Sequence, residues 1–414
     1  MATETKPKAG PHIVSRIRGG RPHSLEEELL LCCARTRIDA EMASRIRQLL
    51  QGDVDWVYLI KLATEHQIAP LLSHNLWEMF PDACPAPILD QLRSLLRANA
   101  ARNIFLAYQL IKVVELLEAH GIPTIAYKGP ILAESIYGNV ALRWFVDLDV
   151  WVHPWNYHFR VTDVLVAHGW QVTSEGTDWE RTFTNPSGVQ LDVHAGLASR
   201  HMPFRLDFDQ VWNRCVKVTV AGKELKTFAP PDLLMVLCVQ LSKDAGIAIR
   251  LPLIKVCDIA ESVRSYQHLD WIALLREADS LGVRRRLSLG LLTADHMLGL
   301  AVPKHVWWND QVVPDLTSLV THIRERVLGE TGIGYSRPDL LDGSRWFSEV
   351  QECLQDRVKL FREFFRAVTP NVRDYSLVRL PRALFPLYYL VRPIRLVRKH
   401  SHYFFRKIFP GSQT

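Results

Sequence analysis

Asp147 and Asp149 are the residues of this chain whose type and spacing point most directly to chemistry. They interrupt an apolar run, and because side chains in a strand alternate between its faces, both carboxylates would point the same way. Val146, Leu148 and Val150 would then lie on the opposite face. Two carboxylates so close resist joint ionisation unless a cation lies between them, and a hard divalent ion such as Mg²⁺ suits their oxygen donors. The pattern predicts phosphoryl or nucleotidyl transfer.

A third carboxylate, Asp192, lies in another apolar, strand-like segment together with Gln190 and His194. In a two-metal transfer site a third carboxylate helps to hold the ion that activates the attacking oxygen, while the other ion steadies the nucleotide phosphates. Paired aspartates also occur on solvated strand faces, and Asp192 could be an ordinary acid beside a turn. Asp is disfavoured in strands, however, so three aspartates in apolar strand contexts favour the functional interpretation. His194 could bind a metal or substrate, or it could be a core histidine with satisfied hydrogen bonds.

Lys128 and Gly129 end the strand-like run that precedes the two aspartates. Gly129 would let the backbone approach a phosphate closely, and a helix starting at Pro130 would direct its positive end toward the same anion. Lys128 could neutralise triphosphate charge, although a lysine at a strand end is often simply solvated. Arg143, four residues before Asp147, could clamp a phosphate or pair with the aspartates. Nucleotide binding by Lys128, Gly129 and Arg143 is therefore predicted.

The segments that must position these residues alternate between strand and helix patterns. Strands are expected at Pro123–Tyr127, Trp144–Val152, Trp170–Ser174, Arg181–Thr184 and Val189–His194. Short helices are expected over Pro130–Tyr137 and Trp155–His168, and a further hairpin joins Val216–Val220 to Glu224–Phe228.

The chain before residue 121 has a helical pattern instead. Ser24 followed by Glu27 is typical of a capping box, and apolar positions recur at helical spacing from there through Leu49. A second helix is expected from about Asp55, and Ile88–His120 could form two helices. The sequence therefore predicts that the chain is divided into five parts. They are a disordered basic tail (1–23), a helical N-terminal region (24–120), an α/β core (121–229), a helical C-terminal region (230–370) and a basic aromatic tail (371–414).

Composition excludes several classes of protein. Of the 414 residues, 48% are hydrophobic and 23% are charged, as in an ordinary globular protein. The seven cysteines are scattered and form no Cys-x-x-Cys pair, which argues against a disulfide framework and against a zinc site. No apolar segment resembles a secretion signal or approaches the 18 residues of a membrane-spanning helix, so a cytoplasmic location is expected.

The positive charge is concentrated at one end. Residues 371–414 carry nine Lys or Arg against one acid, which leaves the other residues at about −2 of the net +6. This tail alternates basic with aromatic and aliphatic residues. It could pack as a terminal helix pair with basic outer faces, lie on an anionic membrane surface, or guide an RNA acceptor through its phosphates.

Taken together, the motifs resemble the uncharacterised nucleotidyltransferase family of the polymerase-beta-like superfamily. Members of that family show a Lys-Gly turn, a short helix ending in Tyr-Gly, an Arg, an Asp-x-Asp pair and a later Asp-x-His. The matching residues here are Lys128-Gly129, Tyr137-Gly138, Arg143, Asp147-Leu148-Asp149 and Asp192-Val193-His194. The resemblance extends over roughly residues 25–300. It departs from the wider superfamily at Pro130, where Ser or a second Gly is usual.

This resemblance implies an α+β fold with a small mixed sheet, flanked by helical N-terminal and C-terminal regions. It also implies metal-dependent transfer of a nucleoside monophosphate from an NTP such as ATP. Asp147 and Asp149 would bind both of two Mg²⁺ ions, for which Mn²⁺ could substitute, and Asp192 would serve as a metal ligand or as the base for the acceptor. His194 would be a possible substrate contact. The acceptor could be a small molecule, a glycan, a peptide, a protein or an RNA.

Two other functions remain compatible with the sequence. The first is a catalytically inactive nucleotide-binding or regulatory protein on the same fold, with the carboxylates retained. The second is a membrane-peripheral scaffold that acts through the basic aromatic tail.

Overall fold

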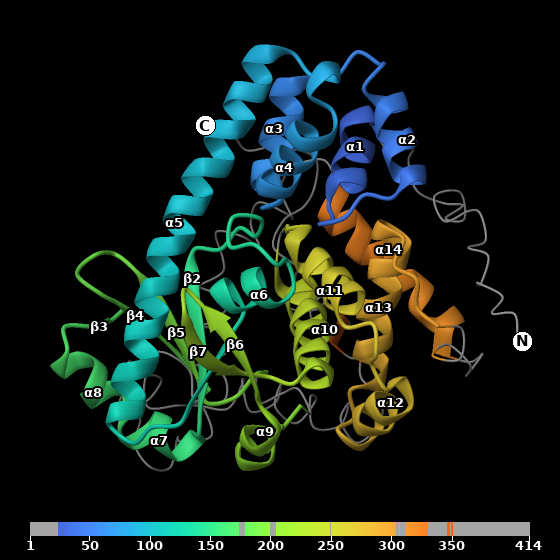
Figure 1. The fold of residues 1–414 in the computed structure, drawn as a ribbon. Helices are drawn as coiled ribbons and strands as arrows, with labels where there is room; N and C mark the ends of the chain where they lie inside the picture. Colours follow the sequence, from blue (N-terminus) through green and yellow to red (C-terminus); the bar gives the residue numbers. More distant parts are fainter. Residues whose placement is uncertain are drawn as a thin grey trace, which may run out of the picture. The chain divides into compact units, whose positions relative to one another are not determined.

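The computed structural model describes residues 24–173, 179–198, 204–248, 250–303, 306, 312–329, 346–347 and 349–350 (Figure 1). The chain divides into two units, residues 1–352 and 353–414, and all described residues belong to the first. The predicted tails 1–23 and 371–414, and most of residues 330–370, lie outside the described residues. Among the residues that are described, no helix has both the length and the apolar character needed to cross a membrane.

A five-stranded mixed sheet lies at the centre of the predicted core. Its strands are, in spatial order, β1 (Thr124–Tyr127), β2 (Asp147–Val152), β5 (Gln190–His194), β4 (Glu180–Thr184) and β3 (Gln171–Val172). β2 and β5 are parallel, and the other neighbours are antiparallel. The hairpin of β6 (Val216–Val220) and β7 (Lys223–Thr227) forms a separate two-stranded sheet.

The two faces of the five-stranded sheet pack against different cores. On one face, Leu148, Val150, Leu191 and Val193 belong to a cluster that includes the C-terminal half of the long helix α5 (Ala86–Ala119), which crosses the sheet (Figure 1). Alternation along each strand sends the next side chains to the other face. There Tyr127, Trp151 and the three aspartates lie, and the apolar members of this set join the core of the helical regions.

Four helices precede α5: α1 (Leu25–Cys33), α2 (Ala40–Leu49), α3 (Trp56–Glu65) and α4 (Ala69–Met79), with a 3₁₀ turn at Pro81–Ala83. The capping box of Ser24 and Glu27 is present at the start of α1. The continuous helical spacing through Leu49 is broken into two helices, because Asn75 Nδ2 donates to the carbonyl oxygens of Cys33 and Arg35 and holds that segment out of helix.

The segment expected to form two helices over 88–120 lies in the single 34-residue helix α5, Ala86–Ala119, followed by His120 as its C-cap. Two of its asparagines determine where β2 begins. Asn99 and Asn103 donate to the main-chain carbonyls of Ala141, Arg143 and Val140, so the segment before Asp147 is a bound loop. The strand therefore begins at Asp147 and not at Trp144.

The remaining helices surround the sheet and complete the helical C-terminal region. They are α6 (Gly129–Ser135), α7 (Pro154–Phe159), α8 (Val161–Ala167), α9 (Phe208–Arg214), α10 (Pro230–Ile247), α11 (Ile254–Ser265), α12 (Trp271–Ser280), α13 (Arg284–Leu298) and α14 (Val312–Leu328). The single helix expected over 155–168 is two short helices that meet at Arg160. α10 and α13 approach closely at Gly290, where a Cβ atom would lie 2.5 Å from Cys238 Sγ.

The predicted fold is thus confirmed as α+β, with a small mixed sheet between helical regions.

Candidate active site

The register of β2 and β5 brings two of the predicted aspartates together. Asp149 pairs with Asp192 across these parallel strands, so both carboxylates leave the same face at the same level. Asp147 lies two residues earlier in β2, on that face, opposite Gln190. Asp149 and Asp192 are only 4% and 8% exposed, and Asp147 is half-buried. Asp147 and Asp192 are 45 residues apart in sequence, yet the three carboxylates share one small area of the sheet.

Asp149 is the most tightly held of the three. Lys128 Nζ lies 2.9 Å from its Oδ1, and His194 Nε2 donates to the same oxygen at 3.1 Å. Burial raises the pKa of Asp149, but Lys128 and His194 together more than offset this and hold the pKa well below its ordinary value. Asp149 is therefore ionised at neutral pH, with a lysine as its counter-ion.

The other two carboxylates have weaker compensation. Burial, and then the neighbouring Asp149, raise the pKa of Asp147. Burial also raises the pKa of Asp192, although Thr182 Oγ1 donates a hydrogen bond to its Oδ1 at 2.7 Å. Negative charge thus accumulates on this face beyond what Lys128 neutralises.

A cavity of about 150 Å³ opens in front of the carboxylates. Lys128, Asp147, Asp149, Asp192 and His194 all line it. The rest of the lining comes from β4 (Glu180), α10 (Gln240, Lys243 and Asp244), α11 (Lys255) and loop residues Trp179, Gly196, Leu197 and Ala198.

The helical side of the cavity is the part whose individual contacts could not be predicted from the sequence. From the sequence alone, Lys243, Asp244, Lys255 and Asp258 are polar positions in an otherwise apolar stretch, where a surface ion pair between Lys255 and Asp258 is favoured over a contact with nucleotide or acceptor. Instead, Lys255 Nζ lies 2.6 Å from Asp244 Oδ2, and Lys243 Nζ lies 3.9 Å from Asp244 Oδ1. The signal was present as three charged residues in otherwise apolar segments, but it did not reveal that they face the sheet.

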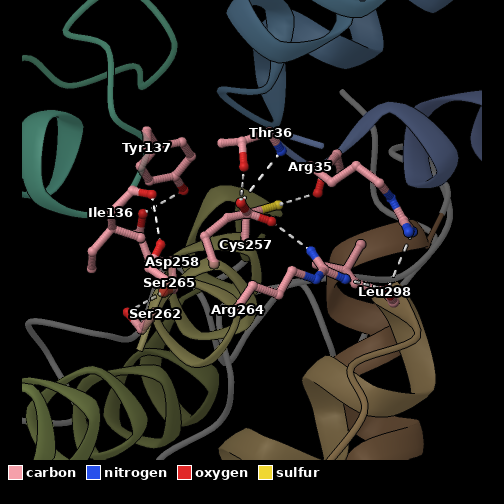
Figure 2. Close-up of polar contacts among 12 residues, drawn as sticks. Arg35, Thr36, Ile136, Tyr137, Cys257, Asp258, Ser262, Arg264, Ser265 and Leu298 are labelled. Atoms are coloured by element: carbon pink, nitrogen blue, oxygen red, sulfur yellow. Dashed lines mark hydrogen bonds and ion pairs between the residues drawn. The ribbon is translucent and has the colours of Figure 1, made fainter. Parts of the chain in front are cut away.

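Arg143 is placed differently from the prediction. Its Nε and Nη2 atoms contact the two carboxylate oxygens of Asp258 in α11 at 2.8 and 2.7 Å, and both side chains are buried. Tyr137 Oη donates to the same carboxylate at 2.7 Å (Figure 2). Arg143 does not line the cavity, so the structure gives no support to nucleotide binding by this residue.

Gly129 also lies outside the cavity lining. Its φ is +42°, and a Cβ atom there would lie 3.4 Å from the carbonyl oxygen of Asp147. The positive φ, which residues with a Cβ atom rarely adopt, therefore accounts for a glycine at this position.

A second buried polar cluster lies beside Asp258 (Figure 2). Glu261 accepts from the main-chain N and the Oγ1 of Thr36 and pairs with Arg264 Nη1 at 2.5 Å. Arg264 and Arg35 each donate to the carbonyl oxygen of Leu298. α11 is therefore joined to the end of α1 and to the end of α13.

The carboxylate face fits a hard divalent cation in its donor chemistry. In the described part of the chain, no three His, Cys, Asp or Glu side chains already stand at a spacing that would hold a metal ion. Asp147, Asp149 and Asp192 nevertheless offer oxygen donors on one face. Because the pKa values of Asp147 and Asp192 are raised, a cation bound there would favour their charged forms.

The model of the family described as "Uncharacterised nucleotidyltransferase" matches residues 52–299, and the chain belongs to this family. The resemblance inferred from the motifs is thereby confirmed.

Two solved structures are distantly similar to the chain. The solution structure of the antibiotic-resistance factor ANT(2'')-Ia is 15% identical, with a TM-score of 0.32 over 42% of this chain and 90% of that chain. The crystal structure of an antigenic nucleotidyltransferase-like protein from Paracoccidioides brasiliensis is 16% identical, with a TM-score of 0.27 over 52% and 97%. No curated protein matches the chain.

Proposed function

We propose that this protein transfers a nucleoside monophosphate from an NTP to an acceptor in a reaction that depends on divalent metal ions. The observation that supports the proposal most directly is the pairing of Asp149 with Asp192 on neighbouring parallel strands, with Asp147 on the same face and a cavity in front. If these three aspartates served only stability, the fold would be expected to neutralise their charge with neighbouring cations. This face of the sheet instead carries more negative charge than its neighbours neutralise.

The residues divide into two groups around the cavity. Asp147, Asp149 and Asp192 would hold Mg²⁺, or Mn²⁺ in its place, and these ions would supply charge neutralisation of the phosphates and of the attacking oxygen. Lys243 and Lys255 on the helical side, together with Lys128, are cations that can meet the triphosphate. His194 orients Asp149 through its Nε2 hydrogen bond.

The proposed reaction is an in-line displacement at the α-phosphorus of the NTP. A hydroxyl oxygen of the acceptor forms a bond to phosphorus, and the bond from phosphorus to the bridging oxygen of pyrophosphate breaks. The hydroxyl proton passes to a base, for which Asp192 is suited because its raised pKa favours accepting a proton. Asp192 can take this role or act as a ligand, but it cannot use the same oxygen for both.

Label transfer tests the proposal. The purified full chain is incubated with each of the four α-³²P-labelled NTPs, beginning with ATP, with Mg²⁺ or Mn²⁺, and with a cell extract as the source of acceptor. Metal-dependent appearance of label in a product is expected with the wild type and with Asp90→Asn, an exposed residue on α5. It is expected to disappear with Asp147→Asn. A wild-type protein that labels nothing but still binds NTP would support the inactive nucleotide-binding alternative instead.

The acceptor class is read from the same experiment. Treating the labelled product with protease, ribonuclease or organic extraction separates a protein, an RNA and a lipid-linked glycan from a small molecule.

A further inference from the structure

Lys128 has an unusual position for a lysine that simply binds phosphate. It lies between β1 and α6 with φ +55° and ψ −156°, a backbone conformation that non-glycine residues seldom adopt. Its ammonium does not extend freely into the cavity but contacts Asp149 Oδ1 at 2.9 Å. The fold therefore holds this lysine where it reaches a carboxylate that the proposed function assigns to metal binding.

The contact differs from a permanent structural ion pair. Lys128 touches one oxygen of Asp149, keeps 23% of its side chain exposed and lines the cavity. Arg143, by contrast, contacts both oxygens of Asp258 and is buried with them. A lysine is a compact charge on a flexible chain, so it can leave its partner without disturbing the backbone.

A divalent ion bound to Asp149 would face this ammonium at close range. Like charges in a poorly solvated cavity repel strongly, so metal and ammonium compete for the same carboxylate. Asp149 is 4% exposed, and few water molecules can screen that repulsion. The ammonium would move only if it gained another anion, and the phosphates of an NTP are the anions that the proposed function brings into the cavity.

We infer that Lys128 is a built-in counter-ion of Asp149 that is exchanged for a divalent metal ion when a nucleotide triphosphate binds. The inference rests on the proposed function, because it assumes that the cavity takes an NTP. The lysine occupies Asp149 in the free protein and transfers to the phosphates in the complex. Metal alone therefore binds weakly, metal and nucleotide bind cooperatively, and the buried carboxylate is never left without a cation.

Mn²⁺ binding tests this without relying on turnover. Calorimetric titration of Mn²⁺ into the full chain is compared for the wild type and Lys128→Met, which keeps the length of the side chain and removes its charge. Lys217→Met, an exposed lysine on β6 paired with Glu224, is the matched control. Lys128→Met is expected to bind Mn²⁺ alone about tenfold more tightly, while Lys217→Met behaves as the wild type.

The coupling is measured from the nucleotide side as well. Affinity for a non-hydrolysable NTP analogue is determined with and without Mn²⁺, and the gain from Mn²⁺ is expected to be about tenfold smaller in Lys128→Met because linkage is reciprocal. Chelation of Mn²⁺ by the nucleotide in solution is the same for both proteins and cancels in the comparison. Lys128→Arg keeps the charge and is expected to restore weak binding of the metal alone.

The outcomes separate the two ideas. If the wild type binds metal and nucleotide but Lys128→Met binds Mn²⁺ no more tightly, the exchange is wrong and the proposed function stands. If the wild type binds neither, both are wrong. Should Lys128→Met fail to fold, Lys128→Gln, which is polar and uncharged, gives the same comparison.

Discussion

The buried carboxylates around Asp149 and around Asp258 are organised differently. Asp258 is enclosed by Arg143, which contacts both of its oxygens, and by the hydroxyl of Tyr137. Around Asp149, two further carboxylates share one sheet face with a single lysine and a single histidine that meet the same oxygen. The Asp258 cluster is saturated, because both carboxylate oxygens have donors. The Asp149 cluster offers more carboxylate oxygens than this one lysine and one histidine contact.

The difference shows how burial can serve stability in one place and chemistry in another. A buried charge is costly unless its partners compensate it, and the Asp258 cluster meets that condition within the fold. Burial lowers the pKa of Arg143, yet Asp258 more than offsets this and holds it above its ordinary value. At Asp147 and Asp192 the pKa values are raised instead, which means that their charged forms are disfavoured and that a nearby cation would stabilise them.

The largest expected effect is on the saturated cluster. Asp258→Asn leaves the guanidinium of Arg143 buried without its counter-charge, and such a loss destabilises by about 3–5 kcal/mol. Urea unfolding followed by far-ultraviolet circular dichroism measures this. The double replacement Asp258→Leu with Arg143→Met removes both charges and is expected to cost less than Asp258→Asn alone. A loss below about 1 kcal/mol for Asp258→Asn would remove the contrast between the two clusters.

Replacing an aspartate of the carboxylate face should reduce activity but not folding stability. Asp147→Asn is expected to lower the rate of label transfer by roughly 10²–10³-fold, since it removes a group that holds charge in the transition state. Its folding stability should be unchanged or rise by about 1 kcal/mol. The sign follows from the raised pKa of Asp147, because ionising it at neutral pH opposes folding. Full activity in Asp147→Asn, with Asp90→Asn as the control, would contradict the assignment.

His66 tests how burial affects a titratable group that stays neutral in the folded protein. His66, at the end of α3, is fully buried, and burial, followed by the charge of Arg250, lowers its pKa to about 4. The unfolded chain takes up a proton near pH 6.5 but the folded protein does not, so stability falls as pH drops from about 6.5 to about 4. The loss amounts to about 3 kcal/mol. Unfolding measured across this range should show it, and His66→Gln should flatten the dependence; an NMR titration of His66 near pH 6.5 would contradict the argument.

The smallest expected effect concerns the lysines across the cavity. Lys243→Met and Lys255→Met should each raise KM for the NTP by about tenfold and change kcat less, since they would remove binding that is present before the transition state. Steady-state kinetics with varied NTP measures this, and Lys217→Met serves as the exposed control. An equal fall in kcat with unchanged KM would place these lysines in the chemical step instead of in phosphate binding.

The carboxylate face could be predicted because it depends on local rules. Alternation along a strand puts Asp147 and Asp149 on one face, and the rarity of Asp in strands marks Asp192. The contacts that the sequence did not predict depend on partners far away in sequence. Arg143 is fixed by Asp258, 115 residues later, and no pattern around Arg143 reveals that contact.

The same explanation holds for the elements of the fold. Periodicity predicts the strands and the helical flanks, and the family resemblance implies that the sheet is mixed, but neither predicts the break between α1 and α2. It depends on Asn75, which binds the carbonyl oxygens of Cys33 and Arg35 from 40 or more residues away. Likewise, β2 begins later than expected because Asn99 and Asn103 in α5 take the carbonyls of the preceding loop.

The buried contacts of α1 have a practical consequence for anyone who shortens the gene. The matched family segment starts at residue 52, yet Leu29, Leu30 and Cys33 are wholly enclosed in the helical core. Thr36 also supplies two of the hydrogen bonds to Glu261. A recombinant fragment trimmed to residue 52 would expose that apolar surface and remove the two hydrogen bonds from Thr36 to the buried Glu261. Expression should therefore begin no later than Ser24, or the truncated product will aggregate.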